Sequence, residues 1–221
     1  MGEQTTIAAV LFDMDGLMFD TERLILRSWQ RALADFGYEA SEEVFMRSVG
    51  RTVAATNQIL RAAYGPDFPL ETTNSRTGDY VWQEVDANGA PLKPGLLALL
   101  DFLEMRGLPK AVASSSERAS IERLLRSVAI QPRFAVIAAG DEVVQGKPAP
   151  DIFLLAASRL GVDPARCLVL EDSEAGACAA HAAGMTAIIV PDLKPPSGEV
   201  ARLAAAVLPD LHAVRAWLAG R

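Results

Sequence analysis

Cysteine is scarce in this sequence, which contains only Cys167 and Cys178. Two thiols cannot build the disulfide framework of a small secreted domain, so we expect both to be reduced and buried. Long hydrophobic runs are also lacking. The run of residues 7–12 ends at Asp13, and none approaches the ~18 residues of a membrane span. The sequence therefore predicts a cytoplasmic protein without a membrane partner.

Basic charge is in deficit, with 21 lysine and arginine residues against 28 aspartate and glutamate residues and a formal net charge of −7. A protein that coats nucleic acid needs a basic face, so this balance argues against a nucleic-acid polymer as partner. It does not exclude a small anionic substrate, because a bound cation makes a site locally positive. Hydrophobic residues make up 50% of the 221 residues, enough for a large core. We expect a monomer or a weak homo-oligomer.

Short apolar runs alternate with longer helical patterns along most of the chain. Such runs are typical of strands buried on both faces, as in a parallel sheet covered by helices. They comprise residues 7–12, 110–113, 134–138, 167–170 and 187–190, and an edge strand is expected at 205–208. The alternation predicts an α/β fold with a doubly wound, Rossmann-like, mostly parallel sheet.

The segment 20–88 breaks this alternation, because it has helical periodicity and no convincing buried strand. Its first apolar residues recur at helical spacing: Ile25, Trp29, Leu33 and Phe36. Glycine and proline divide the segment into several helices. A helical insertion directly after the first strand is typical of a cap domain. We therefore expect an α/β core domain of residues 1–19 and 89–221 and a cap domain of residues 20–88.

Two carboxylates, Asp13 and Asp15, follow the first predicted strand, with Gly16 directly after them. Ligands of open α/β sheets bind beyond the carboxyl ends of the strands, and glycine there lets the backbone turn and a ligand approach. Two desolvated carboxylates so close together repel unless a cation lies between them, and Mg²⁺ prefers oxygen ligands. Taken alone, such a pair is more often a solvated turn.

Three further polar groups follow later strands. Ser114–Ser116 precede a helical pattern, where hydroxyl and N–H groups suit a phosphate or, taken alone, a helix cap. Lys147 lies in the proline-rich loop GKPAPD and could neutralise both a phosphate and an aspartate. Glu171 and Asp172 end an apolar strand and are costly to bury without a metal. Four such groups, each after a strand, predict one site.

These groups resemble the four ordered motifs of the haloacid dehalogenase superfamily. The matching residues are Asp13-Met14-Asp15-Gly16, Ser114, Lys147 with its loop, and Glu171-Asp172. The resemblance covers nearly the whole chain, including the position of the cap. The stretches DMDGLMFDTERL, GKPAPDIF and EDSEAG are similar to the β-phosphoglucomutase and phosphatase branch, which includes pseudouridine 5′-phosphatases. The motifs are specific for the superfamily and poorly specific for the substrate.

The resemblance implies a role for each motif residue. Asp13 would be the nucleophile that forms an aspartyl-phosphate, and Asp15 the general acid and then the general base. The cofactor Mg²⁺ would be held by Asp13, the backbone carbonyl of Asp15, and Asp172, with Glu171 as a further direct or outer ligand. The phosphoryl group would be held by Gly16, Ser114, Ser115 and Lys147.

Absences in the segment 20–88 bear on the branch, since it contains no histidine and no lysine. β-Phosphoglucomutases carry a cap histidine where this chain has Ile25, and they also use a cap lysine, as do phosphonoacetaldehyde hydrolases. True dehalogenases lack the second aspartate, here Asp15. The resemblance thus implies a phosphatase of a small phosphorylated metabolite. Arg51, in a turn that resembles the substrate-facing cap loop, and Glu22 are its candidate substrate contacts.

Two alternatives remain open at this point. One is a phosphomutase of the β-phosphoglucomutase type, which shields the aspartyl-phosphate from water. The other is a non-catalytic metabolite-binding or regulatory protein built on the same scaffold. The substrate also stays open among sugar phosphates, nucleotide monophosphates and phosphoglycolate, because selectivity depends on the shape of the cap.

Overall fold

The structure, a computed structural model, describes residues 6–48 and 53–221 of the chain. The chain divides into two compact units. One consists of the residues up to Asp20 together with Leu92–Arg221, and the other is Thr21–Pro91. The sequence places the second unit at 20–88, so its observed end lies three residues further along the chain. The second unit is therefore an insertion between two parts of the first.

Within the described residues, the first unit contains one sheet of six parallel strands. In chain order the strands are β1 Ala9–Phe12, β2 Lys110–Ser114, β3 Val136–Ala139, β4 Cys167–Glu171, β5 Thr186–Ile189 and β6 Ala206–Val207. Their order across the sheet is β3-β2-β1-β4-β5-β6. The doubly wound α/β fold is thus confirmed. The order changes direction at β1, and the crevice at the carboxyl ends beside such a switch is where ligands bind in this architecture.

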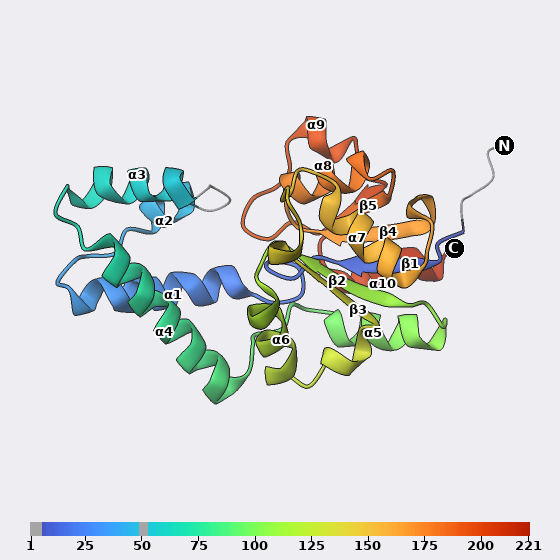
Figure 1. The fold of residues 1–221 in the computed structure, drawn as a ribbon, viewed down its shortest axis with the longest axis horizontal. Helices are drawn as coiled ribbons and strands as arrows, with labels where there is room; N and C mark the ends of the chain where they lie inside the picture. Colours follow the sequence, from blue (N-terminus) through green and yellow to red (C-terminus); the bar gives the residue numbers. More distant parts are fainter. Residues whose placement is uncertain (1–5, 49–52) are drawn as a thin grey trace. The chain divides into compact units, whose positions relative to one another are not determined.

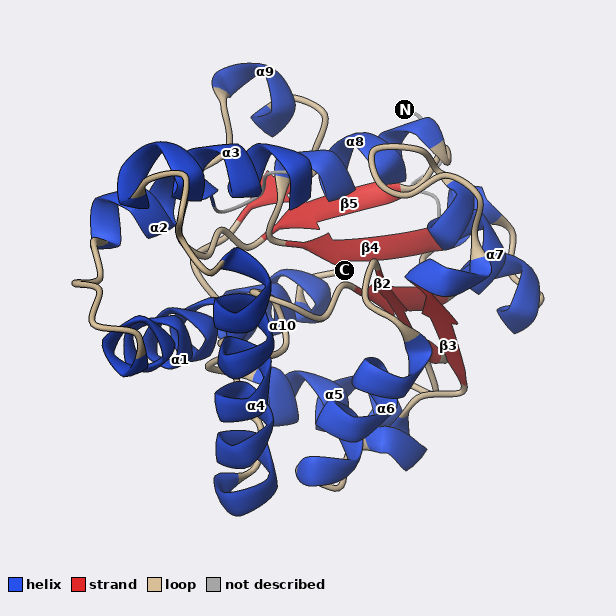
Figure 2. Cartoon of the chain, turned by 60° about the vertical axis from the view of Figure 1, so that its left-hand side comes forward, coloured by secondary structure: helices blue, strands red, loops and turns tan. Residues whose placement is uncertain are grey.

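Helices cover both faces of this sheet (Figures 1 and 2). On one face lie α7 (Asp151–Leu160) and α8 (Glu174–Ala182), and on the other lie α5 (Leu96–Met105) and α10 (Leu211–Ala219). The first face is closed by a core in which Leu11 of β1 packs with Phe153 and Ala179. Burial on both faces explains why β1 and β4 read as unbroken apolar runs.

Shorter elements complete the first unit. They are α6 (Arg118–Ser127), α9 (Gly198–Ala201), and the 3₁₀ turns η1 (Gln131–Arg133), η2 (Gly140–Glu142) and η3 (Pro164–Arg166). Turn η2 is important for the site, because it directly precedes the loop that carries Lys147. The predicted strands agree with the observed ones to within one or two residues at their ends, which is the usual uncertainty of strand boundaries.

The second unit is helical, with α1 Thr21–Asp35, α2 Glu42–Ser48, α3 Val53–Tyr64 and α4 Leu70–Asn88. Helices α1 and α4 pack along each other. A cluster of aromatic rings forms part of its interior: Trp29, Tyr38, Phe45, Tyr64 and Phe68. Two predicted members of the apolar face of α1 are placed differently. Ile25 is 37% exposed, and Phe36 follows the end of the helix. The buried face includes Leu24 and Ala32 instead.

Two short bridges tie together the ends of the first unit where the insertion leaves and returns. Phe19 pairs with Leu92 in antiparallel fashion and with Asp15 in parallel fashion. The backbone N–H of Lys93 also donates a hydrogen bond to the carbonyl oxygen of Met18, at 2.9 Å. In the described part of the chain, no helix is long and apolar enough to cross a membrane.

Candidate active site

The turn after β1 places Asp13 at the carboxyl edge of the sheet. Its backbone N–H still follows the strand pattern and bonds the Leu170 carbonyl of β4, so this residue is fixed by the sheet and is 7% exposed. Gly16 then turns the chain with a φ of +80°, a conformation that strongly favours glycine. A β-carbon at Gly16 would lie 2.2 Å from Oδ2 of Asp172. The tight turn therefore lets β1 and β4 bring their carboxylates together.

Lys147 crosses this edge and joins the carboxylates of two strands. Its ammonium group donates to Oδ1 of Asp13 at 2.5 Å, to Oε1 of Glu171 at 2.6 Å and to the Ala113 carbonyl at 3.1 Å. It also lies 4.8 Å from the ring centre of Phe153. These three hydrogen bonds use all three ammonium protons. Lys147 can thus contact a phosphoryl oxygen only by sharing or releasing one of them.

Glu171 is fully buried, and its hydrogen bonds hold it in one orientation. Oε2 accepts from the backbone N–H of Asp172 at 3.0 Å and from the N–H and hydroxyl of Ser173 at 3.0 and 2.9 Å. Ser173 also caps α8, because its hydroxyl oxygen accepts from the Gly176 N–H. With Oε1 bonded to Lys147, both oxygens accept hydrogen bonds, and Glu171 is thus held in place to orient its neighbours. Oε1 has a second acceptor site, so Glu171 is a candidate direct ligand as well.

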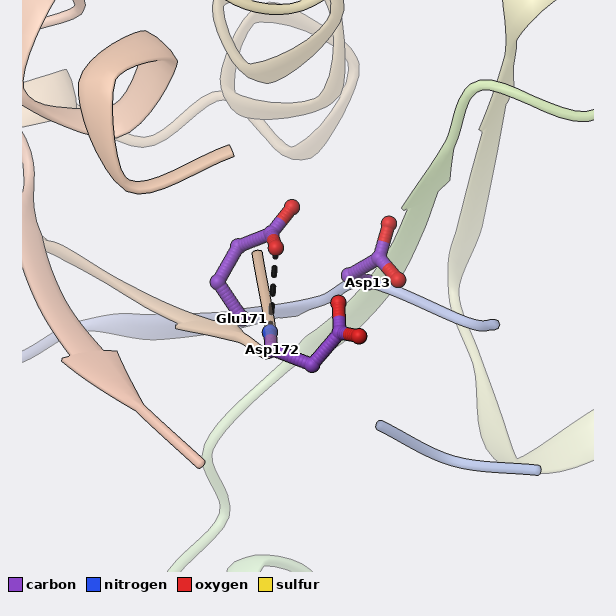
Figure 3. A group of neighbouring side chains, drawn as sticks. All are labelled: Asp13, Glu171 and Asp172. Atoms are coloured by element: carbon purple, nitrogen blue, oxygen red, sulfur yellow. Dashed lines mark hydrogen bonds between the residues drawn. The ribbon is translucent and has the colours of Figure 1, made fainter. Parts of the chain in front are cut away.

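Three carboxylates converge at this edge of the sheet (Figure 3). Asp13, Glu171 and Asp172 each offer an oxygen, and these three atoms lie within 4.8 Å of one another. Burial raises the pKa of Asp13, with Lys147 opposing the shift and Glu171 adding to it. Burial also raises the pKa of Asp172, and the charges of Asp13 and Glu171 raise it further. One ammonium group among three carboxylates leaves an excess of negative charge.

A divalent cation fits this excess. The donor set consists of carboxylate oxygens, which Mg²⁺ prefers, and the group lies at the strand ends where ligands of such sheets bind. Lys147 responds to the same field: burial by itself lowers its pKa, but Asp13 and Glu171 outweigh this and raise it above the ordinary value. The residues present therefore suit an ion of this type.

The serines after β2 lie at the same edge. Ser114 is buried, and its hydroxyl oxygen accepts a hydrogen bond from the Ser116 N–H at 3.1 Å. Ser115 is exposed. The Ser116 hydroxyl donates to Oδ2 of Asp15 at 2.9 Å, so the Asp15 carboxylate turns toward the serine loop and is not one of the three grouped oxygens. The two aspartates of the first motif thus have different partners: Asp13 lies with the grouped carboxylates and Lys147, and Asp15 bonds the serine loop.

The structure thus brings together the residues predicted from the four motifs, including Gly16. The structure does not place the two predicted substrate contacts, Glu22 and Arg51, at this site. Glu22 lies in the first turn of α1, within the second unit. Arg51 lies outside the described residues. Ser116 was predicted only as part of the serine run, with no role of its own, and two further contributors, Ser173 and Gly176, were not predicted as site residues. Ser173 carries a local signal, because serine directly before a helical pattern is a typical cap. The contacts of Ser116 and Gly176 depend on the folded chain.

Comparison with known proteins identifies the family. A model of the haloacid dehalogenase-like hydrolases matches residues 7–184, which include the four motif positions. The chain belongs to the haloacid dehalogenase-like hydrolase family. This haloacid dehalogenase-like hydrolase is therefore an enzyme, and its fold and motif order agree with the resemblance seen in the sequence.

The relatives of this haloacid dehalogenase-like hydrolase include named phosphatases. It is 34% identical over 181 residues to the phosphorylated carbohydrates phosphatase of Thermotoga maritima, covering 81% of this chain and 83% of that one. It is 32% identical over 189 residues to the fructose-1-phosphate phosphatase YqaB of Escherichia coli, covering 83% and 96%. The structure of CbbY from Rhodobacter sphaeroides in complex with phosphate superposes with a TM-score of 0.75 at 28% identity, covering 93% and 95%.

Proposed function

We propose that the protein is a Mg²⁺-dependent phosphatase that hydrolyses a small phosphorylated metabolite through an aspartyl-phosphate on Asp13. The observation that carries this proposal is the position of Asp13, which is buried at the end of β1, bonded to Lys147 and adjacent to the Asp172 carboxylate. A carboxylate held there is a fixed nucleophile beside a site for a cation. Phosphatases of sugar phosphates among the relatives support a small phosphorylated carbohydrate as the substrate class.

Asp13 and Asp172 would hold the Mg²⁺ ion, and Glu171 would fix the Asp172 backbone from behind. The bound ion would supply positive charge that neutralises the phosphoryl oxygens and favours the ionised form of Asp13. Lys147 supplies a second positive charge, which its hydrogen bond to Oδ1 of Asp13 holds beside the nucleophile. Positioning and charge neutralisation account for most of the acceleration of phosphoryl transfer.

The proposed reaction has two steps that share one acid–base group. In the first step, an oxygen of Asp13 forms a bond to phosphorus, the ester P–O bond breaks, and Asp15 donates a proton to the leaving oxygen. In the second step, water attacks the phosphorus of the aspartyl-phosphate and gives its proton to Asp15, which frees phosphate and Asp13. The hydrogen bond from Ser116 is suited to orient Asp15 between these steps.

The test is turnover of an aryl phosphate and of a panel of phosphomonoesters by the pure protein with Mg²⁺. Asp13→Asn removes the nucleophile and should lower kcat by more than about 10³-fold while leaving the circular dichroism spectrum unchanged. The matched control is Asp210→Asn at the cap of α10, where asparagine can also cap, and it should keep full activity.

Two results would contradict the proposal. The first is no phosphate release by the wild-type protein from any member of the panel. The second is Asp13→Asn turnover equal to that of the wild type. Product analysis by ³¹P NMR distinguishes a phosphatase from a phosphomutase. A phosphomutase would convert a sugar 1-phosphate to its 6-phosphate without release of phosphate. We further propose that residues 21–91 act as the cap that selects the substrate.

A further inference from the structure

Beside the three converging carboxylates lies an ion pair that none of the four motifs contains. The ammonium group of Lys93 donates to Oδ1 of Asp192 at 2.7 Å. The side chains of Lys93 and Asp192 are only 16% and 2% exposed. Burying two charges is costly, because both lose their hydration. The position of this pair next to Asp172 therefore indicates a role in the site.

Asp192 reaches the site from β5, the strand next to β4. The two strands pair up to Glu171 and Ile189, and the Val190 N–H bonds the Glu171 carbonyl at 2.7 Å. Asp192 follows two residues later. A β-carbon placed on Gly16 would lie 2.2 Å from Oδ2 of Asp172 and 3.5 Å from Cβ of Asp192. The two aspartates thus border the same small space at the Gly16 turn, and the charge of Asp192 contributes to the raised pKa of Asp172.

Lys93 is held by its backbone as well as by its ion pair with Asp192. It is the second residue of the Leu92–Arg221 part of the first unit. Its N–H bonds the Met18 carbonyl, in the same turn region that follows Asp13. The backbone of Lys93 is thus anchored to the segment that follows the proposed nucleophile, and its ammonium group bonds a carboxylate that lies near a proposed metal ligand.

We propose that Lys93 and Asp192 are positioning residues for the metal site: Asp192 adds a fourth carboxylate to the negative potential beside Asp172, and Lys93 keeps that carboxylate from becoming a metal ligand. This inference rests on the proposed function, because it assumes that Asp13 and Asp172 bind the cation. The pair then controls both the affinity and the selectivity of the site. Mg²⁺ requires an octahedral shell and keeps several waters, whereas Ca²⁺ accepts six to eight oxygen ligands in flexible geometry.

Substitution of either partner should change cation binding in opposite directions. Asp192→Asn leaves the Lys93 ammonium without its carboxylate and should weaken Mg²⁺ binding on the order of tenfold. Lys93→Met removes the ammonium that holds Oδ1 of Asp192, together with a positive charge near the cation, and should tighten Ca²⁺ binding on the order of tenfold, with a smaller gain for Mg²⁺. Lys93→Arg retains the ion pair and should leave both affinities unchanged.

The experiment is calorimetric titration of Mg²⁺ and of Ca²⁺ into the full chain and these variants, with thermal unfolding as a check of the fold. The matched control is Lys110→Met, because Lys110 begins β2 at the opposite edge of the sheet and pairs with Glu104. It removes the same charge and should leave both dissociation constants unchanged. A purely structural role of the pair would lower the Tm without changing the dissociation constants.

Opposite shifts for Asp192→Asn and Lys93→Met support the proposal. Dissociation constants within about twofold of the wild type in both variants, or weaker binding in both, overturn it. If Asp192→Asn fails to fold, Lys93→Met decides alone through its Ca²⁺ affinity. If the wild-type protein binds Mg²⁺ and hydrolyses phosphomonoesters but the variants bind both cations as the wild type does, only the proposed role of the Lys93–Asp192 pair is refuted. A wild-type protein that binds no Mg²⁺ overturns this proposal together with the proposed function.

Discussion

At the scale of single residues, Glu171 is packed directly against a backbone position of α8. A β-carbon at Gly176 would lie 1.8 Å from Oε1 and 1.9 Å from the carboxyl carbon of Glu171. Glu171 cannot move aside, because Lys147 and Ser173 hold its two oxygens. Glycine within a helix lowers stability by about 0.5–1 kcal/mol relative to alanine. Its presence in α8 therefore indicates that room for the Glu171 carboxylate matters more here than helix propensity.

Gly176→Ala should therefore lower the free energy of unfolding by about 1–3 kcal/mol, the range for an overpacked interior, and should also weaken Mg²⁺ binding. Urea denaturation measures the first effect, and calorimetry measures the second. The matched control is Gly78→Ala within α4, where a β-carbon would meet no heavy atom within 4 Å. This control should gain about 0.5–1 kcal/mol from helix propensity. A Gly176→Ala protein as stable as the control would contradict the packing argument.

The sequence makes some of these residues predictable and hides others. Asp13, Lys147 and Glu171 each stand at or after a strand of a parallel sheet, so their chain positions alone place them at one edge. The contacts of Gly176 with Glu171 and of Lys93 with Asp192 depend on how loops and helices approach after folding. Lys93 and Asp192 are 99 residues apart, and neither stands in a motif. Local patterns carry no information on such pairs.

At the scale of elements, Glu142 joins three parts of the first unit. Its carboxylate accepts hydrogen bonds from Arg118 of α6 at 2.7 Å, from Arg159 of α7 at 3.0 Å and from the Ala139 N–H at the end of β3 at 2.9 Å. These partners, Arg159 first, hold the pKa of Glu142 at about 2. Because η2 precedes the Lys147 loop, this junction fixes the start of that loop.

Glu142→Gln should make the protein less sensitive to acid. The folded pKa of about 2 lies below the ordinary value of 4.5, so the stabilisation is fully present above pH 4.5 and is lost as the pH falls from 4.5 to 2. At pH 6 the free energy of unfolding of the wild type should exceed that of the variant by on the order of 1 kcal/mol, a modest amount because Glu142 and its arginine partners are partly exposed. At pH 2 the difference should almost vanish. Urea denaturation across this range measures it, with Glu199→Gln in α9 as the control. A constant difference at all pH values would refute the linkage.

Elements also differ in how far the sequence predicts them. The strands β1 and β4 were predicted because burial on both faces leaves an uninterrupted apolar run. The face of α1 was predicted less well, since Ser28 is buried at 6% exposure while Ile25 is 37% exposed. Thr73 of α4 is also fully buried. Where small polar residues are buried at a helix contact and an apolar residue faces solvent, apolar periodicity alone predicts the wrong buried face of the helix.

At the scale of the whole molecule, the insertion leaves and re-enters the first unit at adjacent points. The Phe19–Leu92 bridge is antiparallel, and Asp20 and Pro91 are the residues next to it in the chain. Each unit also has buried side chains of its own, such as Leu11 in the first and Trp29 in the second. A unit with its own core and adjacent ends meets the conditions for independent folding.

Replacement of Asp20–Pro91 by a two-residue Asn-Gly turn should therefore yield a folded first unit, because that turn would directly join the paired Phe19 and Leu92. The shortened protein should unfold cooperatively in urea and bind Mg²⁺ with nearly the affinity of the full chain, since Asp13, Glu171 and Asp172 all lie outside the insertion. It should lose its preference among phosphomonoesters if residues 21–91 select the substrate. The same deletion carrying Asp172→Asn provides the control and should show no Mg²⁺ heat. An aggregated or non-cooperative product would mean that the first unit needs the insertion to fold, and unchanged substrate preference would mean that selection resides at the sheet edge itself.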